Sequence, residues 1–401
     1  MYDRQEFISK IVQKAETKLV LLVMDGVGDL PVNGRTPLQA ASTPNLDSIA
    51  SQSELGQTIP VFPGVTPGSG PGHLGIFGYD PVKYQIGRGI LEALGTDVEV
   101  GAKDVVARAN FATVKDGIVV DRRAGRPATE VSSKIVELLN SSIREIQGVR
   151  VSFYPGKEHR FVVKLTGDDL SDELTDADPQ KEGRPIEWSK PLTSSANKTA
   201  EIVNELMRRI RDTLKNEPKM NFALIRGFSK YPHLPQFPEI YKLKAAAIAT
   251  YPMYRGIAKL VGMEVVKTGS EIQDELESLK KCWNDFDFFY VHIKKTDSYG
   301  EDGNFEAKVK VIEEVDRLIP ELIKLNPDVL AVTGDHSTPV LMKSHSWHPV
   351  PLMIQSEFSR KGLNSKFDEF ECARGTLGTV QALDVMSLIL AHGMRLEKFG
   401  A

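Results

Sequence analysis

A short run of apolar residues that ends in an aspartate constrains the fold of this chain more than any other feature. Residues 18–24 read KLVLLVM, and the sequence DGVGD follows them at 25–29. An uninterrupted apolar run of this length, bounded by Gly and Asp, is typical of a strand buried on both faces of a parallel sheet. We therefore expect this strand to lie near the centre of a sheet that carries helices on both sides.

Beyond residue 245, short apolar runs alternate with helical segments. The runs predict strands at 245–250, 264–269, 287–293 and 328–334. The segments between and after them predict helices at 254–262, 274–281, 305–325 and 377–393. Strands that alternate with helices imply right-handed parallel crossovers. The chain is thus predicted to be an α/β protein with a doubly wound, mostly parallel sheet.

The middle of the chain has a different pattern of apolar and polar residues, which predicts a second unit. Between residues 104 and 226, short β-like runs are joined by turns and by a polar acidic stretch, and a helix follows at 199–215. This mixture is typical of an α+β unit. Because the first strand lies near residue 20 and the later ones beyond 245, the middle is predicted to be an insertion. The expected boundaries are 1–85 with 236–401 for the α/β domain, and 86–235 for the inserted domain.

Composition excludes several classes of protein. The chain has 401 residues and a formal net charge of −4, and it contains no apolar run of 18 residues. These properties argue against a membrane-spanning protein and against a basic nucleic-acid binder. Two cysteines are too few for a disulfide scaffold, and the first residues lack the apolar core of a secretory signal. A cytoplasmic protein with a small-molecule ligand is expected; the oligomeric state stays open.

Polar side chains gather where the predicted strands end. They are Asp25 after the first strand, Lys294, Asp297 and Glu301 after the strand at 287–293, and Asp335, His336, His345 and His348 after the strand at 328–334. Ligands of doubly wound sheets bind at the carboxyl ends of strands. So many buried carboxylates would be costly without compensating charge. Two divalent cations would supply it, and mixed Asp and His ligands suit zinc or manganese.

A Gly- and Pro-rich segment at 56–81 predicts a long ordered loop that carries function. Within it, Pro71 is a plausible first residue of a helix, which places Ser69 just before the helix N-terminus. Free backbone N–H groups at that end favour an anionic group near the serine hydroxyl. A phosphate cradle of the Walker type is excluded, because no Lys-Ser or Lys-Thr pair follows the glycines.

Basic residues of the inserted unit complete the candidate site. They are Arg108, Arg122, Arg123, Arg126, His159, Arg160 and Arg226, and the run DRRAGR at 121–126 is the densest cluster. Arginine forks match phosphate and carboxylate oxygens in pairs. Solvated surface charge is the competing interpretation for each arginine alone.

Six ordered motifs together resemble one known family. They are VMDGVGD (23–29), GSGPGHLGIFGYDP (68–81), DRRAGR (121–126), HIKKTDSYGEDGNFEAK (292–308), TGDHSTP (333–339) and HSWHPVP (345–351). The chain resembles the archaeal-type, 2,3-bisphosphoglycerate-independent phosphoglycerate mutases of the alkaline phosphatase superfamily. The resemblance covers nearly the whole chain. It implies an alkaline-phosphatase-like fold with the inserted unit as a substrate-binding lid.

The resemblance also implies roles for individual residues. One metal ion would be bound by Asp25, Ser69, Asp335 and His336, and the other by Asp297, Glu301 and His345. Ser69 would be the nucleophile, and Lys294 would balance negative charge beside it. Substrate would be held by Arg108, Arg122, Arg123, Arg126, His159, Arg160 and His348. The metals expected are two Mn²⁺ ions, with Zn²⁺, Mg²⁺ or Co²⁺ as alternatives, and 2,3-bisphosphoglycerate is not expected as a cofactor.

One position departs from the superfamily pattern Asp-x-x-Gly-His. The run here is DSYGE at 297–301, so that Glu301 stands where a histidine ligand is expected. A carboxylate shifts metal preference toward harder ions such as manganese or magnesium. The resemblance implies interconversion of 2- and 3-phosphoglycerate in glycolysis and gluconeogenesis through a phosphoserine on Ser69. A metal-dependent phosphatase, a sulfatase, a phosphopentomutase, a weakly active member or a non-catalytic metal-dependent binding protein are the alternatives.

Overall fold

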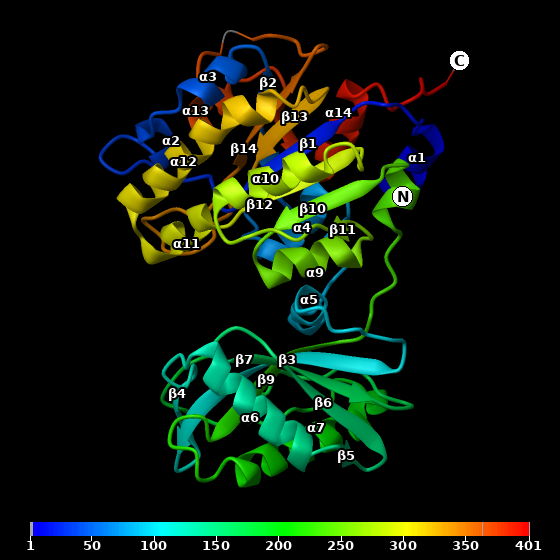
Figure 1. The fold of residues 1–401 in the computed structure, drawn as a ribbon, viewed down its shortest axis with the longest axis vertical. Coiled ribbons are helices and arrows are strands. Elements are labelled where there is room, and N and C mark those ends of the chain that lie inside the picture. Colours follow the sequence, from blue (N-terminus) through cyan, green and yellow to red (C-terminus); the bar gives the residue numbers. More distant parts are fainter. Residues whose placement is uncertain (1–2, 363, 401) are drawn as a thin grey trace. The chain divides into compact units, whose positions relative to one another are not determined.

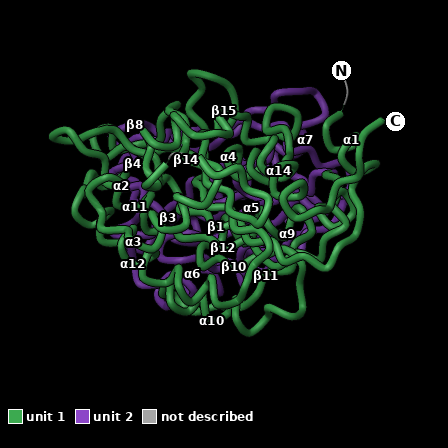
Figure 2. Tube along the Cα trace, turned by 90° about the horizontal axis from the view of Figure 1, so that it is seen from above, with its two compact units in different colours: residues 1–85, 234–401 green, residues 86–233 purple. Residues whose placement is uncertain are grey.

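The computed structural model describes residues 3–362 and 364–400 and divides the chain into two compact units. The first unit comprises Met1–Gln85 and Leu234–Ala401, and the second comprises Ile86–His233. Figure 2 colours the two units separately.

Among the described residues, an eight-stranded sheet runs through the first unit in the order β11-β10-β12-β1-β13-β14-β2-β15 (Figure 1). Every pair is parallel except the two that β14 forms with β13 and β2. The strands are β1 (Leu19–Met24), β2 (Glu54–Ile59), β10 (Ala245–Ala249), β11 (Glu264–Val265), β12 (Phe288–Ile293), β13 (Val329–Thr333), β14 (Val350–Ser356) and β15 (Gly378–Gln381). This mostly parallel sheet confirms the predicted α/β fold class.

The central strand β1 is buried along its whole length, as its apolar sequence predicts. It lies between β12 and β13, with Leu21 opposite Tyr290 on one side. On one face of the sheet, Val20 packs in a cluster with side chains of α10 (Ile272–Cys282) and α12 (Phe305–Ile323). Successive strand residues point to opposite faces. Tyr290 accordingly contacts Phe77, just after α4 (Ser69–Ile76), from the other face.

The second unit, all of whose residues are described, contains a seven-stranded antiparallel sheet. Its strands are β3 (Asp104–Lys115), β4 (Ile118–Asp121), β5 (Glu145–Ile146), β6 (Val149–Pro155), β7 (Arg160–Thr166), β8 (Arg184–Pro185) and β9 (Phe222–Ser229). The helices α6 (Thr129–Ser142) and α7 (Asn197–Thr213) contribute side chains to its core. A further helix, α5 (Arg88–Gly95), contacts β3 and β9. This is the predicted α+β insertion.

Two predicted elements differ from those observed. The helix predicted at 377–393 is wrong at its start, because Gly378–Gln381 forms the edge strand β15, and a helix, α14 (Val385–His392), follows it. The segment 56–81 is not one loop, because it contains most of β2 and the whole of α4. Ser69 is the first residue of α4 rather than the residue before it, and Gly68 caps the helix.

The remaining helices of the described residues are α1 (Arg4–Ile11), α2 (Pro37–Ala40), α3 (Pro44–Ala50), α8 (Phe237–Tyr241), α9 (Pro252–Leu260), α11 (Lys295–Asp302), α13 (Glu369–Ala373) and the 3-10 turns Ser194–Ala196 and Ala382–Asp384. Across the described part of the chain, no helix combines the length and the apolar character needed to span a bilayer.

Candidate active site

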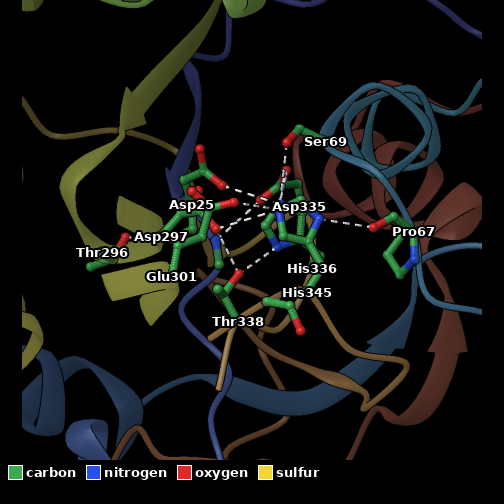
Figure 3. Close-up of polar contacts among 12 residues, drawn as sticks. Asp25, Pro67, Ser69, Thr296, Asp297, Glu301, Asp335, His336, Thr338 and His345 are labelled. Carbon is green, nitrogen blue, oxygen red and sulfur yellow. Dashed lines mark hydrogen bonds and ion pairs between the residues drawn. The ribbon is translucent and has the colours of Figure 1, made fainter. Parts of the chain in front are cut away.

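Three neighbouring parallel strands bring carboxylates to one edge of the large sheet. Asp25 follows β1 directly, and Asp335 lies just beyond the end of β13. Asp297 belongs to α11, which begins just after β12. Because the carboxyl ends of parallel strands meet at one edge, side chains that are distant in the sequence converge there (Figure 3).

Asp25, Asp335 and His336 form the first group of candidate ligands, and all three are completely buried. Nε2 of His336 lies 3.3 Å from Asp25 Oδ1 and 3.1 Å from Asp335 Oδ2. Both carboxylate oxygens of Asp25 and Oδ2 of Asp335 accept no well-aligned hydrogen bond from the described residues. Buried carboxylate oxygens in this state are costly unless a cation compensates them.

Asp297, His336 and His345 form the second group, which shares His336 with the first. Nε2 of His345 lies 3.6 Å from Asp297 Oδ1. The rings of His336 and His345 stack with their centroids 3.6 Å apart. The two groups are therefore adjacent, as a site for two cations requires.

The hydrogen bonds of both histidines assign their tautomers. Thr338 donates its hydroxyl proton to Asp297 Oδ1 at 2.7 Å, so the same hydroxyl accepts from Nδ1 of His336 at 2.9 Å. Nδ1 of His345 donates to the carbonyl of Pro67 at 2.9 Å. Each ring consequently directs the lone pair of Nε2 at carboxylates. A nitrogen lone pair and a carboxylate oxygen repel each other when they face directly. A cation bound between them would instead be a ligand-bound ion held by both groups.

Ser69 reaches this site from the first turn of α4. Its Oγ lies 3.4 Å from Nε2 of His336 (Figure 3). The helix approaches the strand ends closely because Gly72 has no side chain: a Cβ there would stand 2.4 Å from the carbonyl oxygen of Asp335. The positive end of the helix dipole thus faces the same space as the two groups.

Lys294 lies between the carboxylates of the two groups. Its Nζ is 3.1 Å from Asp25 Oδ2 and also forms an ion pair with Asp297. Burial alone would raise the pKa of Asp25, but the ammonium of Lys294 and the imidazoles of His292 and His336 together outweigh it and hold this pKa well below its ordinary value. Burial alone would lower the pKa of Lys294, yet the two carboxylates raise it. Both groups are therefore charged at neutral pH.

Glu301 lies beside the second group rather than within it. Its Oε1 is 3.9 Å from Nε2 of His345, and its side chain is 55% exposed. Partial burial and the nearby carboxylate of Asp297 raise the pKa of Glu301. A rotation of this exposed side chain suffices to change which oxygen faces His345.

A fully buried lysine holds the loops of the site together. Nζ of Lys308 donates to the carbonyls of Gly26 and Thr338, at 2.9 and 3.0 Å, and to Asp29 Oδ2 at 2.7 Å. Gly26 follows the candidate ligand Asp25, and Thr338 contacts both Asp297 and His336. The three donors of one ammonium thus link the loops after β1 and β13.

The predicted basic residues gather within the second unit around His159. Burial, together with the charges of Arg160, Arg108, Arg123 and Arg126, lowers the pKa of His159 to about 4. Its imidazole is therefore neutral at pH 7 among four guanidinium groups. Such a concentration of positive charge favours an anionic ligand.

Arg122 is engaged differently from its neighbours. Its Nε and a terminal nitrogen donate to the buried carboxylate of Asp178, at 3.1 and 2.6 Å. Arg226 approaches the same carboxylate, with its Nε 3.7 Å from Oδ2. Asp178 thus orients two arginines at once. His348, by contrast, stacks on Trp347 and contacts the hydroxyl of Ser346.

Several residues of the site were not among the predicted ones. They are His73, Tyr254, His292, Thr338 and Lys308. Thr338 and His73 lie within motifs that the sequence analysis singled out, Thr338 three residues after Asp335 and His73 four residues after Ser69, and these positions were a usable signal. Lys308 and His292 stand at the two ends of the motif at 292–308, but no strand end or ligand pattern distinguished them there from residues that are satisfied locally.

Fold and site together define an α/β protein with a candidate two-cation centre at the carboxyl end of its sheet. The model of the family described as 2,3-bisphosphoglycerate-independent phosphoglycerate mutase matches residues 50–220. A relative from Thermotoga neapolitana, a probable 2,3-bisphosphoglycerate-independent phosphoglycerate mutase, is 70% identical over all of both chains. One with the same description from Thermus thermophilus is 51% identical over 98% of each chain.

Two solved structures are similar over almost the whole chain. The cofactor-independent phosphoglycerate mutase from Thermoplasma acidophilum is 32% identical, with a TM-score of 0.71 over 94% of this chain and 100% of that one. The PH0037 protein from Pyrococcus horikoshii is 30% identical, with a TM-score of 0.83 over 96% of this chain and 99% of that one. The chain belongs to the 2,3-bisphosphoglycerate-independent phosphoglycerate mutase family. This confirms the resemblance found in the motifs.

Proposed function

We propose that the protein interconverts 2- and 3-phosphoglycerate without 2,3-bisphosphoglycerate, as an intramolecular phosphotransferase that forms a phosphoserine on Ser69. The observation that carries the proposal is the position of the Ser69 hydroxyl. It lies 3.4 Å from Nε2 of His336, at a helix N-terminus and beside two buried carboxylate–imidazole groups. Membership of the family supports the same reaction.

Two divalent cations belong to this proposal. Asp25, Ser69, Asp335 and His336 would hold one, and Asp297, Glu301 and His345 the other. Mn²⁺ fits a site of mixed carboxylate and imidazole ligands, and Zn²⁺, Mg²⁺ and Co²⁺ are the alternatives. When bound, the cations supply positive charge that polarises phosphoryl oxygens and lowers the pKa of a serine hydroxyl.

The chain's own groups carry the transfer. Oγ of Ser69 forms a bond to phosphorus while the ester bond to the glycerate oxygen breaks, and the proton lost by the serine ends on that oxygen. In the second half, the other hydroxyl of glycerate attacks the phosphoserine, its proton returns to Ser69, and the isomeric ester forms. Backbone N–H groups of the first turn of α4 face the phosphoryl oxygens. The ammonium of Lys294 balances their negative charge.

A mutase must keep glycerate bound between the two halves of the reaction. The basic residues of the second unit provide positive charge that can retain it. The glycerate carboxylate would be held by Arg108, Arg122, Arg123, Arg126, Arg160 and neutral His159. His348, close to the metal groups in sequence, would contact the substrate as well. The substrates place the protein in glycolysis and gluconeogenesis, in the cytoplasm.

Replacement of Ser69 by Ala tests the proposal. The variant is expected to lose interconversion of the two phosphoglycerates and to incorporate no label from a phosphorylated substrate after acid quenching. Ser48→Ala, a change at an exposed serine of α3, serves as the control and should leave both readouts unchanged. Near-parental turnover by Ser69→Ala would contradict the covalent scheme. Steady release of inorganic phosphate by the parent would instead favour a phosphatase.

A further inference from the structure

Behind the first group of candidate ligands lie two completely buried imidazoles that the proposed reaction does not use. His73 belongs to α4 and His292 to β12, and neither exposes any of its surface. Nδ1 of His73 lies 3.0 Å from Asp335 Oδ2, and Nε2 of His292 lies 3.4 Å from Asp25 Oδ2. Each of the two carboxylates of this group thus has one of these imidazoles within ion-pair distance of its Oδ2.

The hydrogen bond that His73 makes to the helix backbone sets its protonation. Nδ1 of His73 lies 2.9 Å from the carbonyl oxygen of Ser69, one turn earlier in α4. A carbonyl only accepts, so Nδ1 carries the proton, and Asp335 Oδ2 faces the same N–H. This nitrogen has no lone pair to offer a cation. Through this nitrogen, His73 links the backbone carbonyl of Ser69 to the carboxylate of Asp335.

The two rings are held in place by aromatic side chains. The ring of Tyr254 from α9 lies 3.8 Å from that of His292 and 4.7 Å from that of His73, centroid to centroid. The rings of His73 and His292 are themselves 5.2 Å apart. Such packing removes rotational freedom from both imidazoles, so each presents one nitrogen to one carboxylate.

We propose that His73 and His292 are positioning residues that orient Asp335 and Asp25 for a divalent cation, each through a different ring nitrogen. The inference rests on the cation site of the proposed function. Donors behind a ligating group fix its orientation and tune its basicity, and their loss typically lowers metal affinity about 10- to 100-fold. Here the groups behind the ligands are imidazoles that lie 3.0 and 3.4 Å from carboxylate oxygens, within ion-pair distance but without the alignment of a full hydrogen bond.

Because His73 faces its carboxylate with Nδ1 and His292 with Nε2, replacement by Asn and by Gln should have opposite effects at the two positions. The amide nitrogen of Asn stands near the place of Nδ1, and that of Gln near the place of Nε2. His73→Asn should therefore retain the donor to Asp335, whereas His73→Gln should lose it. At the other position the order reverses, because His292→Gln should retain the donor to Asp25 and His292→Asn should lose it. A role in packing alone has no reason to produce this reversal.

The experiment measures Co²⁺ binding to the full-length, chelator-treated protein by calorimetry and by the visible absorption of the bound ion. We expect His73→Gln and His292→Asn to weaken one of the two sites about 10- to 100-fold, and the other two variants to stay within a few-fold of the parent. His392→Asn is the matched control, because His392 is also a largely buried histidine of the first unit, bonded to Ser356 far from the ligands. It should bind Co²⁺ as the parent does.

Each result decides the inference. Parental affinity in His73→Gln and His292→Asn overturns it, and so does an equal loss for Asn and Gln at both positions. Thermal unfolding of the cation-free protein shows whether each variant is folded. If a variant at one position is not, the Asn and Gln variants at the other position test the inference. Because the readout is cation binding, a parent that binds two ions without mutase turnover contradicts the proposed function and leaves this inference standing. A parent that binds no Co²⁺ overturns both.

Discussion

The imidazole rings of His336 and His345 stack at a centroid distance of 3.6 Å, at an angle of 23° between their planes. Each ring donates through Nδ1, His336 to Thr338 and His345 to the carbonyl of Pro67. Both Nε2 lone pairs therefore face carboxylates from one stacked pair. This relationship joins the two candidate cation groups into a single centre, and the residues around it yield testable consequences.

Glu301 lies beside the proposed second cation site, and its replacement tests whether it is a ligand. Its replacement by Gln removes a charged oxygen beside His345, and we expect the affinity of one of two Mn²⁺ ions to fall about tenfold, since a hydrogen bond or ligand involving a charge contributes about 1.5–3 kcal/mol. Glu301→His should move the preference of this site toward Zn²⁺. Metal content and calorimetry check both variants. Unchanged binding of two ions in Glu301→Gln would remove Glu301 from the ligands.

Lys308 should matter for stability as much as for the site. Replacement by Met leaves the carboxylate of Asp29 buried without its ammonium partner, and breaking such a pair typically costs about 3–5 kcal/mol. Urea unfolding of Lys308→Met should show this loss in the free energy of unfolding. Lys310→Met, at an exposed position of the same helix, should change it little. A Lys308→Met variant as stable as the control would show that the buried pair contributes no net stability.

Glu275 should make stability depend on pH. Burial raises its pKa to about 9 in the folded protein, against an ordinary value of 4.5. The folded state thus keeps a proton that the unfolded state loses, so stability falls as pH rises from about 4.5 to about 9. Glu275→Gln removes this loss and should stabilise the protein by up to about 3 kcal/mol at pH 7.

Unfolding curves between pH 5 and 9 check this prediction. The difference between Glu275→Gln and the parent should grow with pH across this range. Glu277→Gln, a partly exposed residue of the same helix in a surface ion pair, should show a nearly constant difference. Parallel pH profiles for Glu275→Gln and the parent would contradict a neutral, buried Glu275.

Asp178 should affect substrate binding without touching substrate. It orients Arg122 through two hydrogen bonds and also approaches Arg226. In Asp178→Asn the amide accepts through one oxygen only, and we expect KM for phosphoglycerate to rise at least about tenfold, the effect of losing roughly 1.4 kcal/mol of charge-assisted hydrogen bonding. Co²⁺ affinity should stay at the parental value. A normal KM would show that the two arginines keep their place without Asp178.

The sequence predicted the fold where its signals were local. The apolar run at 18–24 and the alternation after residue 245 indicate buried parallel strands, and the structure has them in β1, β10, β12 and β13. The edge strand β15 was missed because its residues continue without a break into the apolar residues of α14. Its identity as a strand depends on pairing with β2, more than 300 residues earlier, which no local pattern records.

The residues of the candidate site were predicted mainly from their positions just after predicted strands. Asp25, Asp297, Asp335 and His336 follow strands that are neighbours in the sheet, and general rules for parallel sheets place such residues at one edge. His292 could not be found in this way. It sits within the buried strand β12, and it gains a role only because Asp25 and Tyr254 meet its ring across the fold.

Anomalous diffraction from crystals soaked in Mn²⁺ tests the central claim most directly. The account predicts two strong peaks, one among Asp25, Ser69, Asp335 and His336 and the other beside Asp297 and His345. A map without density at these carboxylates and imidazoles, from crystals of protein that turns over phosphoglycerate, would contradict it.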